Sequence, residues 1–177
     1  MTTRIGQAVM LLHGGDREEA RGRFLDLWAE IGEEGDALHR CTLAHFMADA
    51  QDDPADELAW DLRALSAADE LTQARAAEHH GSLAVRALYP SLHLNLAADY
   101  AKLGRREAAR GHLGVARESV GVLGDDAYCD GIRAGIGRLE TRLDREGPGG
   151  TPEPAPGRGR GPGAPGGETL GPPRREP

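Results

Sequence analysis

The sequence is poor in aromatic residues, cysteine and lysine, and it has no long run of apolar residues. Aromatic residues make up 4% of the 177 positions, so a core must consist mainly of Leu, Ala, Val and Ile. Because Ala and Leu favour helices and β-branched runs are few, this composition predicts an all-α fold. Cys41 and Cys129 are too few for a disulfide framework, and we expect two buried free thiols in a reducing compartment. Lys102 is the single lysine of the chain.

The missing segments and motifs exclude several function classes. No stretch approaches about 18 consecutive apolar residues, and no basic start leads into an apolar run with a cleavage site. We therefore expect no membrane contact and a cytoplasmic location. The net charge of -8 repels phosphate backbones, so nucleic acid is not an expected partner. Neither a Gly-x-Ser-x-Gly elbow nor a Gly-x4-Gly-Lys-Ser/Thr phosphate loop is present, and we expect neither an enzyme nor a bound cofactor.

The composition divides the chain into two parts. Nineteen of the 31 residues from Gly147 to Pro177 are Gly or Pro, which predicts a disordered tail over 147–177. The short Gly157–Gly161 segment within it is weakly basic, so a hook for nucleic acid or an acidic partner is the alternative to a solvated tail. Residues 1–146 form the predicted folded domain.

The folded part has the apolar spacing of one helix after another. Gly14-Gly15 permits a left-handed cap, and Asp53-Pro54 places an acidic cap before a Pro at the first helical position. We expect Asp16 to cap a helix as well. Pro90 either kinks or restarts the fifth helix. The helices are expected near 5–12, 16–31, 38–48, 53–78, 83–103, 108–120 and 126–143.

One hairpin pattern within this array is specific. Small residues recur where two helices would cross, large ones fill the adjacent gap, and Gly occupies the turn. The residues concerned are Leu96, Ala97, Tyr100, Gly104, Ala109 and Leu113. This pattern resembles the tetratricopeptide repeat (TPR), a 34-residue helix-turn-helix, and more narrowly it resembles stand-alone TPR-like proteins of actinobacteria. His93 stands where the family has Trp, and Gly121 where it has Pro.

The N-terminal part fits the same frame. Its matching positions are Ala8, Leu11, Gly15, Ala20, Phe24 and Leu27. A step of 34 residues from Ala8 leads to Thr42, so a second, weaker repeat is expected to start in frame. The resemblance implies an antiparallel helix-hairpin solenoid of about three hairpins, with a capping helix at its C-terminal end.

The resemblance also implies a function and a site. TPR proteins bind proteins or peptides on a concave face lined by the first helix of each hairpin, so we expect a binding adaptor. Leu43 and Met47 are expected as apolar neighbours of this face. Asn95 with nearby cations resembles what some repeats use to hold a peptide carboxylate, but the full pattern is absent and Asp99 would oppose an anion. The predicted site residues are His13, Asp36, His39, Arg40, Phe46, Leu94, Asn95 and Lys102.

Two other functions compete with the adaptor. Three hairpins bury little, so a second copy could cover an end or the groove and form a homodimer or other self-associating structural module. Alternatively, His39, Cys41 and His45 could form part of a metal or small-molecule sensor. A zinc site needs three or four converging ligands, however, and we interpret these side chains and the adjacent His79-His80 as structural.

Overall fold

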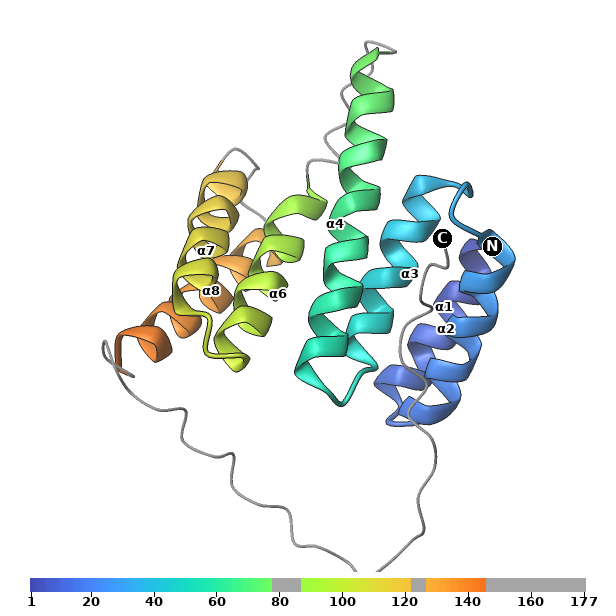
Figure 1. Cartoon of the computed structure of the whole chain (residues 1–177), viewed down its shortest axis with the longest axis horizontal. Coiled ribbons are helices and arrows are strands. Elements are labelled where there is room, and N and C mark those ends of the chain that lie inside the picture. The colour runs from blue at the N-terminus through green and yellow to red at the C-terminus, as the bar shows by residue number, and fades with distance from the viewer. Residues whose placement is uncertain (78–86, 122–126, 146–177) are drawn as a thin grey trace, which may run out of the picture.

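The computed structural model describes residues 1–77, 87–121 and 127–145, and all its regular elements are helices (Figure 1). An all-α fold is therefore confirmed for the described residues. None of the described helices is both long and apolar enough to cross a membrane. The seven described helices are α1 (Thr2–His13), α2 (Arg17–Ile31), α3 (Ala37–Asp49), α4 (Pro54–Ala77), α6 (Leu88–Lys102), α7 (Arg106–Gly121) and α8 (Ala127–Arg145).

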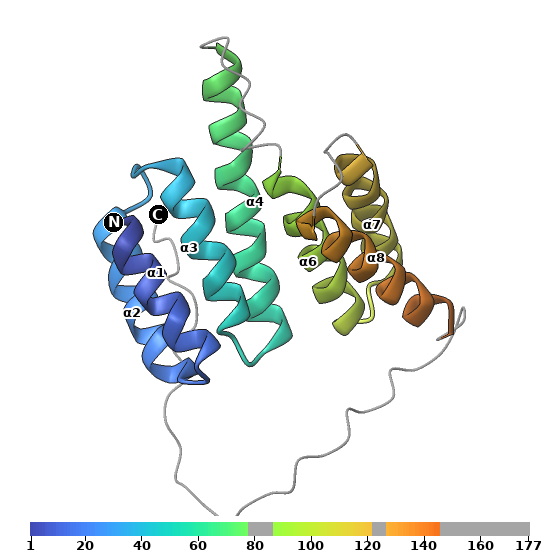
Figure 2. The ribbon, with the colours of Figure 1, turned by 180° about the vertical axis from the view of Figure 1, so that it is seen from behind.

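The helices pack mainly as consecutive antiparallel pairs. The pairs are α1 with α2, α3 with α4, and α6 with α7, and α8 packs on both α7 and α6 (Figures 1 and 2). Neighbouring pairs meet where α2 and α1 contact α3 and where α4 contacts α6. The first helices of the three pairs are α1, α3 and α6. Side chains link α1 to α3 at His13 and Phe46, and α3 to α6 at His45 and Asn95, on one side of these helices. We call this side the first-helix face.

Local signals explain where most helices start and stop. The Asp53 carboxylate accepts hydrogen bonds from the N–H groups of Ala55 and Asp56 at 2.7 and 3.4 Å, which confirms the predicted start of α4. Gly15 and Gly104 have φ values of 92° and 72°, which favour glycine in these turns. Asp16 precedes α2, but its side chain makes no capping hydrogen bond.

Pro90 lies in the first turn of α6, where a missing N–H leaves no intrahelical bond unmade. The described part of α6 begins at Leu88 instead of the expected Leu83. Residues 78–86 lie outside the described residues, so His79-His80 and the expected helix over 83–87 cannot be placed there. The predicted tail over 147–177 also lies outside them.

Small residues lie where the paired helices meet. Ala8 and Ala20 are fully buried in the first pair, and Ala97 and Ala109 are fully buried in the third. Leu113 and Phe24 fill the adjacent space, as their spacing predicts. The core that α3, α4 and α6 share is likewise built largely from small side chains: Cys41, Ala44, Ala64, Ala67 and Ala68, with Leu92.

The second pair departs from the predicted frame. Thr42, expected at the small buried position, is partly exposed and donates its hydroxyl to the Leu38 carbonyl at 2.8 Å. Ala44 takes the buried position instead. Leu43 and Met47 are fully buried core residues and do not line the first-helix face. The 34-residue step is therefore wrong by two residues here, because the connection between α2 and α3 is longer than a repeat of fixed period allows.

Candidate functional site

His13 and Phe46 meet across the first two helices of the first-helix face. Their rings pack edge to face with centroids 6.4 Å apart, and Phe46 also contacts His45, at 5.2 Å. His45 in turn lies 3.4 Å from the Asn95 amide nitrogen on α6, measured from its Nδ1 atom. The structure thus joins three predicted residues, His13, Phe46 and Asn95, into a continuous row through His45.

Asp36 and His39 lie at the opposite end of α3 from Phe46. The Asp36 carboxylate caps the helix by accepting the His39 N–H at 2.9 Å. The His39 ring is 3.2 Å from the same carboxylate, and its Nε2 atom is 3.0 Å from the Thr2 hydroxyl on α1. These two predicted residues therefore form a separate polar contact between α1 and α3.

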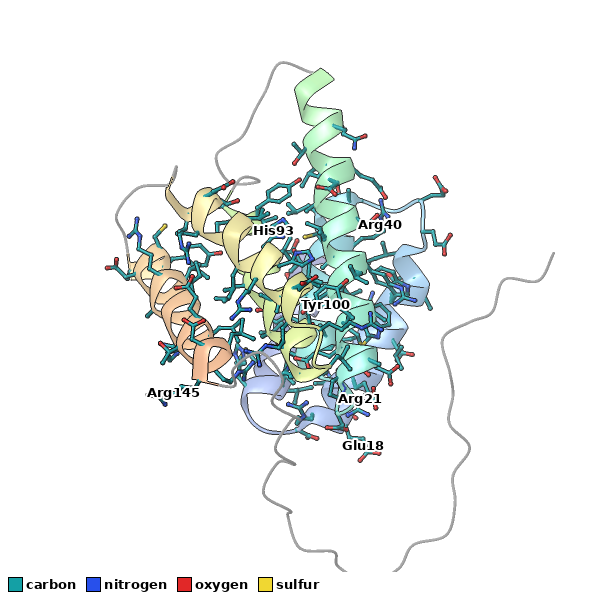
Figure 3. All side chains as sticks on the ribbon, turned by 60° about the vertical axis from the view of Figure 1, so that its left-hand side comes forward. Glu18, Arg21, Arg40, His93, Tyr100 and Arg145 are labelled. Atoms are coloured by element: carbon teal, nitrogen blue, oxygen red, sulfur yellow. The ribbon has the colours of Figure 1, made fainter. Side chains whose placement is uncertain are left out.

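Arg40 and Leu94 do not have the positions that we expected. Arg40 is only 13% exposed, donates to the Gly35 carbonyl at 3.0 Å and pairs with Glu70 on α4 (Figure 3). Its guanidinium is directed at α4 by the ion pair with Glu70. Leu94 packs against Gly135 of α8, which covers much of the α6 surface there.

Lys102, the eighth predicted residue, lies at an acidic cluster formed by Asp49, Glu57, Asp61 and Asp99. Its ammonium is 2.5 Å from both Glu57 oxygens and 3.3 Å from an Asp99 oxygen. The four carboxyl groups come from α3, α4 and α6, so the cluster lies where the second and third helix pairs join. Asp49 is exposed, and the side chains of Lys102 and Glu57 are 37% and 21% exposed.

Asp61 and Asp99 form the buried centre of this acidic cluster. Each is 1% exposed. Both Asp61 oxygens and one Asp99 oxygen have no hydrogen-bond partner, and the nearest cationic group to Asp61 is the His45 ring at 3.7 Å. Desolvated carboxylates without partners are costly, because most buried polar groups are hydrogen-bonded. This is the most unusual polar feature of the described residues.

The electrostatics of the pair favour a bound proton. Burial above all, then the charges of Asp61 and Glu57, raise the pKa of Asp99 to about 8, against the opposing effect of Lys102. A hydrogen bond between Asp61 and Asp99 needs one of them protonated, since two carboxylates are both acceptors. The raised pKa of Asp99 therefore favours a proton on this carboxyl group, which would give the pair a hydrogen bond that two carboxylates cannot form.

The pKa values of the groups around this pair are shifted as well. Burial lowers the pKa of His45, but the attraction of Asp61, whose oxygen lies 3.7 Å from the ring, outweighs this effect, so the pKa is raised overall. Burial also lowers the pKa of Lys102, and its contacts with Glu57 and Asp99 again reverse the direction. Burial raises the pKa of Asp49. The cluster therefore retains protons and cations.

The geometry does not assemble the alternative metal site. Cys41 is buried in the core that α3, α4 and α6 share, where burial raises the pKa of its thiol to about 11 and keeps it protonated. His39 points toward Thr2 and His45 toward Asn95. Within residues 1–77, 87–121 and 127–145, no three His, Cys, Asp or Glu side chains are placed to hold a metal ion.

A second group of rings lies between α6, α7 and α4. Tyr89, His93, His112 and Tyr100 stack in a column with centroid spacings of 6.2, 5.1 and 5.3 Å (Figure 3). The Nδ1 atoms of His93 and His112 are 2.9 Å apart, so one ring donates to the other. Burial lowers the pKa of both histidines. This column anchors α6 to its neighbours.

Sequence reasoning missed Asp61, although a signal for it exists. Leu62 follows Leu58 by four residues and so has the spacing of an apolar helix face, yet it is 42% exposed, whereas Asp61 is buried. Asp61 follows Leu58 by three residues and precedes Ala64 and Ala68 by three and seven, so it interrupts a buried stripe at helical spacing. Comparison of the chain with protein-family models, with curated proteins and with solved structures gives no match.

Proposed function

We propose that this chain is a TPR-like helical repeat module that binds a protein or peptide segment on its first-helix face and performs no catalysis. The antiparallel pairs, the small residues at their contacts and the row from His13 to Asn95 support this proposal. Helical arrays of this kind offer extended surfaces that suit elongated segments.

The ligand segment carries a positive charge in this proposal. The single observation behind it is the buried pair Asp61 and Asp99, whose three oxygens without hydrogen bonds lie where α4 of the second pair meets α6 of the third. The sequence resemblance to carboxylate-binding repeats favoured an anionic ligand. Lys102 is already neutralised by Glu57 and Asp99, however, so it offers no free charge to a carboxylate.

Calorimetry with peptides of defined charge tests this function. The probes are acetylated, amidated decapeptides in which Gly alternates with Arg, Lys, Gln or Glu. We expect the cationic peptides to bind and the Gln and Glu peptides not to bind. Equal binding of all four, or of none, would contradict the proposal.

A charge-matched pair of variants separates site binding from general attraction. Glu57→Gln removes one negative charge at the acidic cluster, and Glu18→Gln removes one at the exposed start of α2 (Figure 3). We expect at least about a tenfold loss of affinity for Glu57→Gln, as for a charged hydrogen bond. Glu18→Gln should have little effect, and equal losses would show that only net charge matters.

A further inference from the structure

We infer that the acidic cluster is a guanidinium site, in which Lys102 is a resident cation that the arginine side chain of a ligand replaces. This inference rests on the proposed peptide-binding function and specifies the group that is recognised. It assigns Lys102 the opposite role to the one expected from the sequence: a competitor of the ligand instead of a contact to it.

The Asp61 and Asp99 oxygens that lack hydrogen bonds indicate which shape of cation the cluster would bind best. The Lys102 ammonium contacts Glu57 and one Asp99 oxygen but leaves both Asp61 oxygens and the other Asp99 oxygen without partners. An ammonium is a compact point charge, whereas a guanidinium presents five N–H donors in a planar fork. The ammonium makes three contacts here, so a guanidinium with five N–H groups can keep these and add up to two more without adding charge.

The exposure of the side chains in the cluster indicates how the arginine of a ligand can replace the Lys102 ammonium. Lys102 and Glu57 are partly exposed and Asp49 is exposed, whereas Asp61 and Asp99 are each 1% exposed. Lys102 is the last residue of α6, on a flexible stem that can return its ammonium to solvent. The incoming group replaces one positive charge by another, so the carboxylates are never left without a cation.

The Asp99 proton leaves when the guanidinium enters. Without a second cation, the raised pKa of Asp99 favours a proton on its carboxyl group beside the charge of Asp61, because both groups are acceptors when ionised. A guanidinium that donates hydrogen bonds to both carboxylates makes this proton unnecessary. Binding near pH 7 should therefore release up to one proton, which calorimetry in phosphate and in Tris measures as a buffer-dependent heat.

Three peptides test the shape of the site. The probes are the acetylated, amidated Gly-Arg decapeptide and its counterparts with Lys and with citrulline, which keeps the shape of arginine without its charge. We expect the Arg peptide to bind about tenfold or more tightly than the Lys peptide, and citrulline to abolish binding. Equal affinity for Arg and Lys would overturn the guanidinium assignment while leaving cation binding intact.

The variant Lys102→Met tests the replacement. Met keeps an apolar stem of similar length without the competing ammonium, so we expect the Arg peptide to bind more tightly, by about tenfold. The matched control is Arg23→Met on α2. The Arg23 side chain pairs with Glu19, and the variant removes the same charge at a distance from the cluster. Weaker binding to Lys102→Met would show that Lys102 contacts the ligand and would overturn the inference.

Chemical labelling of the intact protein gives a second readout. Lys102 is the single lysine, so its acetylation by an N-hydroxysuccinimide ester is followed on one peptide by mass spectrometry. Saturation with the Arg peptide, which has no free amine, should accelerate labelling several-fold by releasing the ammonium. An unchanged or slower rate with the peptide bound would overturn the replacement. If no peptide binds at all, the proposed function itself fails.

Discussion

At the scale of the residue, the buried aspartate pair makes stability depend on pH. The pKa of Asp99 is raised to about 8 in the folded state, so folding favours its proton. That contribution is fully present below the unfolded pKa near 3.8 and is lost as the pH rises through about 8. His45, whose folded pKa is also raised, acts in the same direction. We therefore expect the protein to be less stable at pH 8.5 than at pH 5.5.

The variant Asp99→Asn should remove most of this dependence. The amide of this variant has no proton to lose in this pH range, so the stability of the variant should change less with pH. At pH 8.5 the variant should be more stable than the wild type. One linked proton is worth at most about 1.4 kcal/mol per pH unit. Urea denaturation at both pH values measures this change, with the exposed Asp26→Asn on α2 as control. Parallel pH curves for wild type and Asp99→Asn would contradict the assignment.

Residues of the core could be predicted better than residues of the cluster. Ala97, Ala109 and Gly104 were found from spacing because packing and turn geometry restrict the residue types that fit. Asp61 and Asp99 were missed as a pair because they are 38 positions apart and acquire their burial only when α4 meets α6. Most acidic residues cap helices or face solvent, so the type alone gives no signal.

At the scale of the element, the contact of α6 with α7 depends on small side chains. Ala109 is fully buried, in the same core cluster as Ala97. Ala109→Arg must open this contact or bury a charge, which costs about 3 kcal/mol or more. Urea denaturation measures the loss. The control is Ala29→Arg, on the exposed side of α2, which should change stability by about 0.5 kcal/mol or less. Similar losses for both would contradict the packing described.

Helix existence followed from the sequence more reliably than helix register. Capping by Asp53 and the turns at Gly15 and Gly104 are local effects, and each was predicted. The register of α3 was wrong because it was carried over from α1 by a fixed step of 34 residues. The corresponding buried alanines, Ala8 and Ala44, are in fact 36 positions apart. A surface connection such as the one between α2 and α3 can be longer by two residues without disturbing the core on either side.

At the scale of the whole molecule, α8 completes the helical array. Leu139 and Leu143 are buried against α6 and α7, and Arg106 on α7 donates to the Leu143 carbonyl. We expect a chain that ends at Arg145 to keep its melting temperature, because the Gly/Pro composition of residues 147–177 offers little to bury. A chain that ends at Arg138 loses both leucines and should lose about 3 kcal/mol or more. A melting temperature several degrees lower for the chain 1–145 would show that the C-terminal segment contributes to the fold.

The net charge of -8 creates an electrostatic field that acts on a charged ligand before the ligand contacts the protein. A cationic peptide is attracted over distances of about one Debye length, so salt should slow its association while affecting dissociation less. Stopped-flow measurements with the Arg decapeptide should show an association rate at least about tenfold lower at high salt than at low salt. Glu57→Gln should act mainly on dissociation, because the contact it removes forms only in the complex. If Glu57→Gln and Glu18→Gln both change association alone, binding is governed by the general field of the molecule, and the acidic cluster has no specific part in it.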